Sequence, residues 1–209
     1  MLKNYIETSD GVIKQVENFG EKKIYNTEYI SNSYDTYGEK ITNMSHLRLG
    51  FLLAIINEPI NTILDIGYGN GGFLKLCSTF FPKTYGHDIS GYSLPEGCEF
   101  VDNILSSKFD VVCFFDSLEH FEEIEFVSKI DTKYVFISLP WCHNNSDEWF
   151  ENWKHRKPNE HIYHFNDKSL KTFMKRMGYE CMIISNFEDV IRKPKNKEYN
   201  ILSGIFKKI

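Results

Sequence analysis

The sequence predicts an α/β fold with a doubly wound, mainly parallel seven-stranded sheet, helices on both faces and a C-terminal antiparallel strand hairpin. Two observations predict this fold class. Short, almost wholly apolar runs recur along the chain, as expected of strands covered on both faces, and helical patterns separate most of them. The last two runs have no helical pattern between them, so we expect them to pair as a hairpin.

Seven apolar runs account for the strands of the sheet. In chain order they span residues 62–66, 83–88, 98–101, 110–115, 134–139, 180–185 and 199–206. A loop rich in Trp, His and Asn is expected between the fifth and the sixth strand, from residue 141 to residue 165.

The helices are placed by their apolar spacing and by their ends. Apolar residues at steps of three and four predict a helix over residues 45–57, which Pro59 ends. A second helix follows the first strand, and a third is expected from residue 117 to residue 129. Asn166 is expected to cap the last helix, whose end Gly178 suits.

We expect one domain with an amino-terminal extension. The 209 residues suffice for one substantial core, whereas the first part of the chain has weak periodicity and one short hairpin near residues 11–16. We therefore divide the chain into a cap or lid segment, residues 1–42, and a ligand-binding domain, residues 43–209.

Charge and cysteine content narrow the partners and the compartment. The formal net charge of −5 argues against electrostatic capture of nucleic acid, so a small molecule is the expected partner. No run approaches the about 18 apolar residues of a membrane-spanning helix. The five cysteines are odd in number and scattered, which favours a reducing compartment, and we expect a cytoplasmic protein.

A glycine-rich turn follows the first strand and is the leading candidate for a ligand site. It reads Gly67-Tyr-Gly69-Asn-Gly71-Gly72, and glycines let the backbone approach a ligand closely. Three of these glycines also satisfy G-x-G-x-x-G, so a nicotinamide or flavin dinucleotide is one alternative.

Asp65 distinguishes between the possible ligands of this turn. It lies in an otherwise apolar strand, where a buried carboxylate is costly unless a cation or hydrogen-bond donors meet it. An ammonium-bearing ligand would meet it, whereas the pyrophosphate of a dinucleotide would be repelled. Local hydrogen bonds that the turn amides donate to Asp65 are a compatible second interpretation.

These segments resemble a known family. Residues 63–71, Ile-Leu-Asp-Ile-Gly-Tyr-Gly-Asn-Gly, resemble the first motif of class I S-adenosylmethionine-dependent methyltransferases, and residues 85–90 resemble the end of their second strand. Residues 109–121 are similar to the fourth-strand motif of the same family. The resemblance implies S-adenosylmethionine as the cofactor, whose ammonium group agrees with the inference from Asp65.

The resemblance also implies roles for individual residues around the cofactor. Asp88 should accept hydrogen bonds from both ribose hydroxyls, and Ile89 should pack on the adenine. Asp102 and Asn103 should face the adenine amine, although a surface turn is an equal alternative for them. We also count Asp116, at the end of the fourth strand, among the cofactor-binding residues.

Acidic residues and a histidine after the fourth strand suggest the chemistry. Asp116, Glu119 and His120 are similar to the E-x-x-E-H segment of ubiquinone-type O-methyltransferases, which holds a divalent cation, with Asp116 replacing the first Glu by a shorter ligand. His120 is the candidate general base. Asp116-x-x-Glu119 also matches a helix capping box, which leaves the cation an open question.

The loop after the fifth strand resembles the wall of the acceptor pocket in small-molecule methyltransferases. Within it, His161 and His164 are the catalytic candidates, because a step of three turns both toward one site, and either could complete a cation site with Glu119 and His120. Tyr29, Tyr34 and Tyr37 are expected to form a lid over the cofactor or an aromatic cap on the sheet.

The predicted function is methyl transfer from S-adenosylmethionine to a small-molecule acceptor. Transfer to oxygen is favoured over transfer to nitrogen, with a sugar or a phenolic metabolite as the acceptor. The alternatives are an NAD-dependent oxidoreductase and a non-catalytic module that binds S-adenosylmethionine.

Overall fold

A seven-stranded mixed sheet forms the centre of the computed structural model, which describes residues 3–17, 26–27, 39–194 and 198–209. The strand order is β5-β4-β3-β6-β7-β10-β9, and all pairs from β5 to β7 are parallel. The strands are β3 (Thr62–Ile66), β4 (Lys83–His87), β5 (Cys98–Phe100), β6 (Lys108–Phe115), β7 (Asp131–Pro140), β9 (Tyr179–Ser185) and β10 (Ile201–Lys208). The predicted fold class is confirmed.

The two last strands form the expected antiparallel hairpin, but their order in the sheet is the reverse of their order along the chain. Strand β10 lies between β7 and β9 and is antiparallel to both. The parallel part of the sheet therefore ends at β7, and β9 forms the outer edge.

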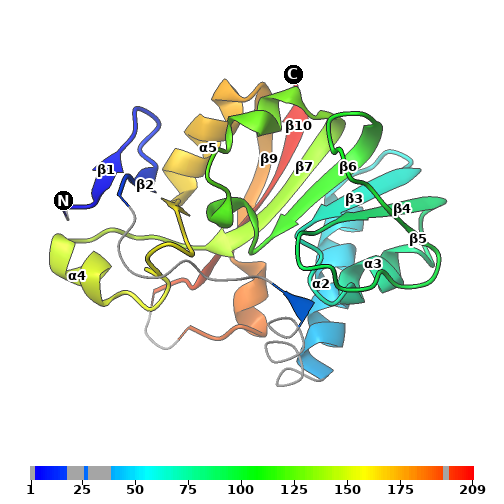
Figure 1. The fold of residues 1–209 in the computed structure, drawn as a ribbon, viewed down its shortest axis with the longest axis horizontal. Coiled ribbons are helices and arrows are strands. Elements are labelled where there is room, and N and C mark those ends of the chain that lie inside the picture. Colours follow the sequence, from blue (N-terminus) through cyan, green and yellow to red (C-terminus); the bar gives the residue numbers. More distant parts are fainter. Residues whose placement is uncertain (1–2, 18–25, 28–38, 195–197) are drawn as a thin grey trace.

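Helices cover both faces of the sheet (Figure 1). The central strand β6 is therefore buried on both sides, which explains its largely apolar sequence. Val111 and Cys113 pack on one face with helices α2 (Glu39–Ile55) and α3 (Gly72–Cys77). Val112 and Phe114 pack on the other face with helix α5 (Asp167–Arg176). Alternate residues of a strand point to opposite faces, so a strand buried on both sides needs apolar residues at each position.

The prediction of one helix over residues 117–129 is wrong. Two short 3-10 helices stand there instead, η1 (Leu118–His120) and η2 (Glu125–Lys129), joined through the extended residue Phe121. The carbonyl oxygen of Glu119 accepts a hydrogen bond of 2.8 Å from the amide of Ile162 rather than from an amide one turn later in the same helix. Tertiary pairing thus replaces the hydrogen bonds that would continue the helix.

A second, smaller sheet lies beside the main one and includes part of the long loop after β7. Strands β1 (Tyr5–Glu7) and β2 (Ile13–Gln15) form the hairpin that we expected, and β2 pairs antiparallel with β8 (Tyr163–His164). The same loop contains helix α4 (Asp147–Asn152), which sequence patterns did not predict. The hairpin and α4 occupy the left side of the molecule in Figure 1.

The beginning of α5 follows the prediction closely. Asn166 caps it through a capping box, in which its side chain accepts from the Ser169 amide at 2.8 Å and its own amide donates to the Ser169 hydroxyl at 2.9 Å. Within the described ranges, every helix is too short or too polar to span a lipid bilayer.

Candidate active site

The glycine turn connects β3 to α3 at the carboxyl ends of the parallel strands. Gly67, Gly69 and Gly71 all have positive φ angles, of 80°, 58° and 73°. A Cβ atom on Gly67 would lie 2.6 Å from the Cβ of Ser117, which follows β6. The turn therefore needs glycine both for its backbone conformation and for its close contact with the neighbouring strand. It is an open backbone cradle at the edge where ligands bind in such sheets.

Asp65 lies inside the sheet just before this cradle. Its residue is 2% exposed, and its Oδ1 has no hydrogen-bond partner among the described residues. Burial raises the pKa of Asp65 to about 7, and the nearby Asp88 adds to the increase, while Arg48 opposes it. A buried carboxylate oxygen without a donor fits a cationic ligand group, as the sequence suggested.

Asp88 follows β4, and two backbone amides hold its carboxylate beside the cradle. Oδ2 accepts from the Gly69 amide at 2.9 Å and Oδ1 from the Ser90 amide at 2.7 Å. Each oxygen retains a lone pair, so this fixed carboxylate has the capacity to accept two further hydrogen bonds. The next residue, Ile89, is 78% exposed and presents an apolar surface at the same edge.

Asp102 and Asn103 lie at the surface after β5. Both residues are exposed, and the Asn103 side chain accepts from the Leu105 amide at 3.0 Å. The Asn103 carbonyl oxygen accepts from the Ser106 hydroxyl at 2.7 Å. These bonds build a local turn, which is the alternative that the sequence left open for Asn103.

Asp116 belongs to an ion-pair network at the end of β6. It has a φ of 51°, and Arg192 Nη1 lies 2.9 and 2.7 Å from its two carboxylate oxygens. Arg48 lies 3.6 Å from Asp116 and also pairs with the buried Glu188 at 2.7 Å. Burial alone would raise the pKa of Asp116, but the two arginines outweigh it and lower this pKa.

This network corrects two interpretations of Asp116. The carboxylate does not cap η1, whose first turn follows Ser117 without a side-chain cap, so the capping-box alternative is wrong. Asp116 is also outside the one group of possible metal ligands among the described residues. The physical reason is the same in both cases, because the Asp116 carboxylate is engaged in its ion pair with Arg192 at 2.7 Å.

Glu119, His120 and His161 form that group of possible ligands. One ligand atom from each lies within 4.8 Å of the other two, and His120 Nε2 is 3.8 Å from Glu119 Oε1. The ring centroids of His120 and His161 are 4.6 Å apart, with the rings nearly perpendicular. The long loop therefore brings His161 to the two residues after β6, as one of the two arrangements that we predicted.

The electrostatics of this cluster are unusual. Glu119 is 1% exposed, and neither of its carboxylate oxygens has a hydrogen-bond partner among the described residues. Burial raises the pKa of Glu119 well above its ordinary value, and burial lowers the pKa of both His120 and His161. His161 Nδ1 is likewise buried and unpartnered within the described chain. Neutral imidazoles beside an unpartnered carboxylate are a donor set suited to a divalent cation.

Among the described residues, His164 lies outside the group of possible ligands but next to it, since its ring centroid is 6.4 Å from that of His161. Its ring packs between Tyr5, Phe150 and Trp153, with centroid distances of 5.8, 5.1 and 5.6 Å. Burial lowers the pKa of His164 to about 3, so the ring is neutral. This packing suits a supporting residue, and a catalytic role of His164 beside His161 stays a prediction.

Two further residues that we did not predict as site residues support the cluster, one by contact with His161 and one through the turn that precedes it. His155 stacks on His161 with ring centroids 6.4 Å apart and hydrogen-bonds to Asn200 Oδ1 at 3.1 Å through Nε2. Gln15, from β2, forms two hydrogen bonds with Asn159, at 2.7 and 2.9 Å, and so fixes the turn before His161. No local sequence pattern indicates these contacts, because His155 and Asn200 are 45 positions apart and Gln15 and Asn159 are 144 positions apart.

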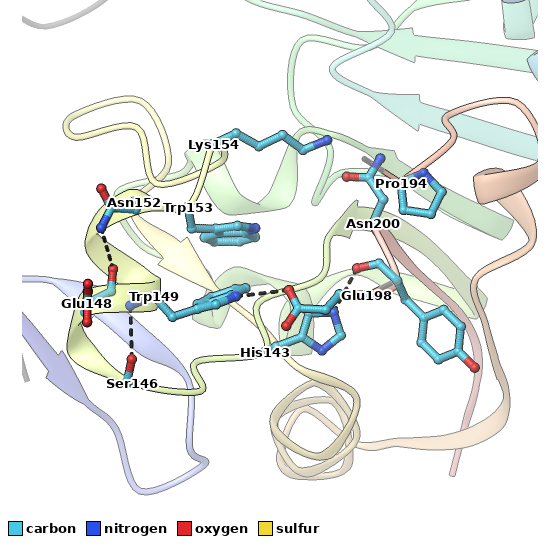
Figure 2. A pocket seen from close by; sticks show the side chains of 11 residues that line it. His143, Ser146, Glu148, Trp149, Asn152, Trp153, Lys154, Pro194, Glu198 and Asn200 are labelled. Carbon is cyan, nitrogen blue, oxygen red and sulfur yellow. Dashed lines mark hydrogen bonds between the residues drawn. The ribbon is translucent and has the colours of Figure 1, made fainter. Parts of the chain in front are cut away.

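A cavity of about 530 Å³ lies between α4 and residues 198–200 (Figure 2). We name it the aromatic pocket after the rings that line it, which are those of His143, Trp149, Trp153 and Tyr199. Asn200, the partner of His155, is also part of its lining. Tyr29, Tyr34 and Tyr37, expected in a lid, lie outside the described residues, so that role stays a prediction.

Comparisons with known proteins agree with this geometry. The family described as "Methyltransferase domain" matches residues 39–183, which is most of the chain. A curated tRNA (guanine-N(7)-)-methyltransferase of Coprothermobacter proteolyticus is 27% identical over 90 residues. That alignment covers 43% of this chain and 27% of the relative, so the chain spans much less than two thirds of that protein.

Solved structures share the fold at low sequence identity. Magnesium protoporphyrin IX methyltransferase from Synechocystis PCC 6803, solved with bound SAH (S-adenosylhomocysteine), has a TM-score of 0.59 and 16% identity, covering 88% of this chain and 96% of that one. The methyltransferase in complex with the Haloferax volcanii Trm112 activator has a TM-score of 0.61 and 12% identity, covering 89% and 99%.

Membership of the family excludes the NAD-dependent oxidoreductase that the glycine motif alone would have allowed. The match includes both the glycine cradle and the end of β6, where the cofactor and acceptor sides of the candidate site meet. The chain belongs to the methyltransferase-domain family and is a class I S-adenosylmethionine-dependent methyltransferase.

Proposed function

We propose that this protein transfers a methyl group from S-adenosylmethionine to an oxygen atom of a small molecule, at a site formed by Glu119, His120 and His161. The observation that carries the proposal is Glu119, a fully buried carboxylate that has no hydrogen-bond partner in the described chain and lies beside two neutral imidazoles. Leaving such a group unsatisfied costs about 1–3 kcal/mol or more, which argues for a function.

On the cofactor side, each residue has a role that its geometry supports. Asp65 would bind the ammonium group, Asp88 the two ribose hydroxyls and Ile89 the adenine face. Gly67, Gly69 and Gly71 would let the backbone reach the methionine part of the cofactor. When bound, S-adenosylmethionine supplies a methyl group on a cationic sulfur, so the leaving group needs no acid. The arginines that neutralise Asp116 make it a supporting residue of this side rather than a direct ligand.

On the acceptor side, Glu119, His120 and His161 would hold a divalent cation. One carboxylate and two imidazoles leave coordination positions open for acceptor oxygens, and a bound cation would supply polarisation of an acceptor hydroxyl. The chain's own contribution is to keep both imidazoles neutral and to orient the acceptor. If no cation is used, His120 would accept the hydroxyl proton directly.

A small molecule is the preferred acceptor because of the net charge of −5 and the aromatic pocket next to the cluster. Related proteins are named for tRNA, a porphyrin and a glycopeptide, so an assay has to include these classes. A sugar or a phenolic compound remains our proposal. The protein is proposed to act in the cytoplasm, which its five free cysteines support.

Two titrations and one transfer assay test the proposal. Calorimetry should detect S-adenosylhomocysteine binding that Asp65→Ala abolishes, because the ammonium group loses its partner. Calorimetry with Mn²⁺ should detect one site that Glu119→Gln removes while leaving S-adenosylhomocysteine binding intact. Glu122→Gln, three residues away, is the matched control. A protein that binds the nucleoside product but no Mn²⁺ would contradict the cation site.

The transfer assay uses S-adenosylmethionine labelled on the methyl carbon and separate pools of sugars, phenols, porphyrins, glycopeptides and tRNA. We expect label to reach an oxygen of a sugar or phenol, with loss of transfer in His120→Ala. Transfer only to tRNA, or only to nitrogen, would refute the proposed acceptor. Cofactor binding without any transfer would instead favour the non-catalytic module.

A further inference from the structure

We propose that the aromatic pocket binds an uncharged sugar ring of the methyl acceptor. This inference rests on the proposed function and deepens it, because it names the substrate class. The cavity of about 530 Å³ falls within the roughly 300–1,000 Å³ that is usual for small-molecule sites. A monosaccharide or disaccharide unit fits a space of this size.

Two tryptophans supply an apolar platform. Trp149 and Trp153 stack on each other with ring centroids 5.3 Å apart, and both remain half-buried although they line the cavity. The His143 ring stands nearly perpendicular to Trp149 at 5.9 Å. Large flat rings that keep a partly exposed face offer contact area for the C–H face of a sugar at little entropic cost.

The polar groups of the pocket suit hydroxyl donors. Glu198 lies at the centre of Figure 2, and its carboxylate is fixed by Trp149 Nε1 at 3.0 Å and by Asn145 Nδ2 at 2.7 Å. Each carboxylate oxygen retains acceptor capacity after these bonds. The Asn152 side chain donates to the Glu148 carbonyl at 2.9 Å, which orients its amide at the rim.

The charges of the lining disfavour other ligands. Among the described residues of the lining, the carboxylates of Glu148 and Glu198 outnumber the ammonium of Lys154, which disfavours a phosphorylated or otherwise anionic ligand. A simple phenol would use the rings but offers one hydroxyl to several acceptors. A neutral ring with one apolar face and several hydroxyls uses both kinds of lining.

The pocket adjoins the proposed catalytic cluster through two side chains. Asn200 lines the pocket and accepts from His155 Nε2 at 3.1 Å, and His155 stacks on His161 at 6.4 Å. A sugar held in the pocket would therefore be next to the wall of the cluster. The geometry points to a subsite for the part of the acceptor that is remote from the methylated hydroxyl.

Intrinsic fluorescence tests this subsite directly, because two of the chain's three tryptophans line the pocket. Titration with methyl β-glucoside, methyl β-galactoside, N-acetylglucosamine and cellobiose should give a saturable change at millimolar concentrations. Trp153→Ala and Glu198→Gln should each weaken sugar binding about tenfold or more. Glu151→Gln, on helix α4 two residues before Trp153 and outside the lining, is the matched control and should bind like the unchanged protein.

S-adenosylhomocysteine titration of every variant separates the possible failures. Unchanged affinity for it shows that a variant is folded and that the loss is confined to the pocket. If the unchanged protein binds S-adenosylhomocysteine but none of the sugars, the subsite is refuted while the proposed function stands. If calorimetry finds binding of p-cresol or a nucleoside but of no sugar, the substrate class is refuted. Absence of S-adenosylhomocysteine binding would refute the proposed function itself.

Discussion

Burial of Asp65 disfavours its charged form, and a cationic ligand group would favour that form again. The fold buries the Asp65 carboxyl group, none of the described residues donates a hydrogen bond to Oδ1, and burial raises its pKa to about 7. A ligand ammonium group would favour the charged form and lower this pKa again. Binding and protonation of Asp65 are therefore coupled, and pH measures the coupling.

S-adenosylhomocysteine should bind more weakly as the pH falls below about 7. In the ligand-free protein Asp65 is protonated below its pKa, so binding then requires loss of a proton, and the affinity should fall by about tenfold per pH unit. Above pH 7 the affinity should be flat. Calorimetry from pH 5.5 to pH 8 measures this change in affinity, because the range extends about one pH unit or more on each side of the pKa of Asp65. Asp65→Asn should bind weakly with no such slope; a slope retained in that variant would assign it to another group.

Asp65→Asn should also stabilise the ligand-free protein at pH 8. The folded pKa of Asp65 lies above its ordinary value of 3.8, so the carboxyl group costs stability as the pH rises from about 4 to about 7. Removing the charge should raise the free energy of unfolding by on the order of 4 kcal/mol at pH 8, and by nothing at pH 3.5. Urea denaturation at both pH values checks the difference, with Asp131→Asn at an exposed position as the control.

At the scale of elements, the smaller sheet supports the acceptor side. Strand β2 pairs with β8, which contains His164, and the Gln15–Asn159 pair fixes the turn before His161. Asn159 has a φ of 61°, a conformation that needs support from its surroundings. The amino-terminal hairpin is thus part of the site rather than a separate decoration.

Gln15→Met should damage the acceptor side and spare the cofactor side. The variant keeps the side-chain volume but loses both hydrogen bonds to Asn159, so we expect Mn²⁺ affinity to fall about tenfold, which corresponds to 1.4 kcal/mol. S-adenosylhomocysteine affinity should not change. Ile6→Thr, at an exposed position of β1, is the control. Equal losses of both affinities would mean that Gln15 matters only for global stability.

The elements also show where sequence patterns succeed. Strand β3 and its glycine turn were predicted residue by residue, because a buried run followed by glycines has few other structures. The prediction of a helix over residues 117–129 was wrong, because apolar spacing does not reveal that the Ile162 amide donates a hydrogen bond to the Glu119 carbonyl. Local patterns predict elements well until a distant segment competes for their hydrogen bonds.

At the scale of the whole molecule, the cofactor and acceptor sides differ in how much the sequence reveals. The residues that we propose to contact the cofactor lie between residues 65 and 89, so short motifs describe them. The acceptor side combines β2, the end of β6, the loop after β7 and residues 198–200. No spacing rule joins Gln15 to Asn159 or His155 to Asn200, and both pairs appear only in the folded chain.

Ligand binding should stabilise the molecule as a unit. At a concentration 100 times its dissociation constant, S-adenosylhomocysteine should raise the free energy of unfolding by about 2.7 kcal/mol. Thermal unfolding followed by circular dichroism should show one transition that shifts upward, and the shift should vanish in Asp65→Ala. Two separate transitions, with only one shifted, would mean that the two sides unfold independently.

The position of β10 sets an order for the assembly of the protein during synthesis. All five parallel strands have left the ribosome once residue 140 is free, so the glycine cradle has its complete neighbours early. Strand β10, which joins β9 to β7, is synthesised last, and residues 198–200, which line the aromatic pocket, immediately precede it. A nascent chain would hence acquire its nucleoside-binding side first and its acceptor side last.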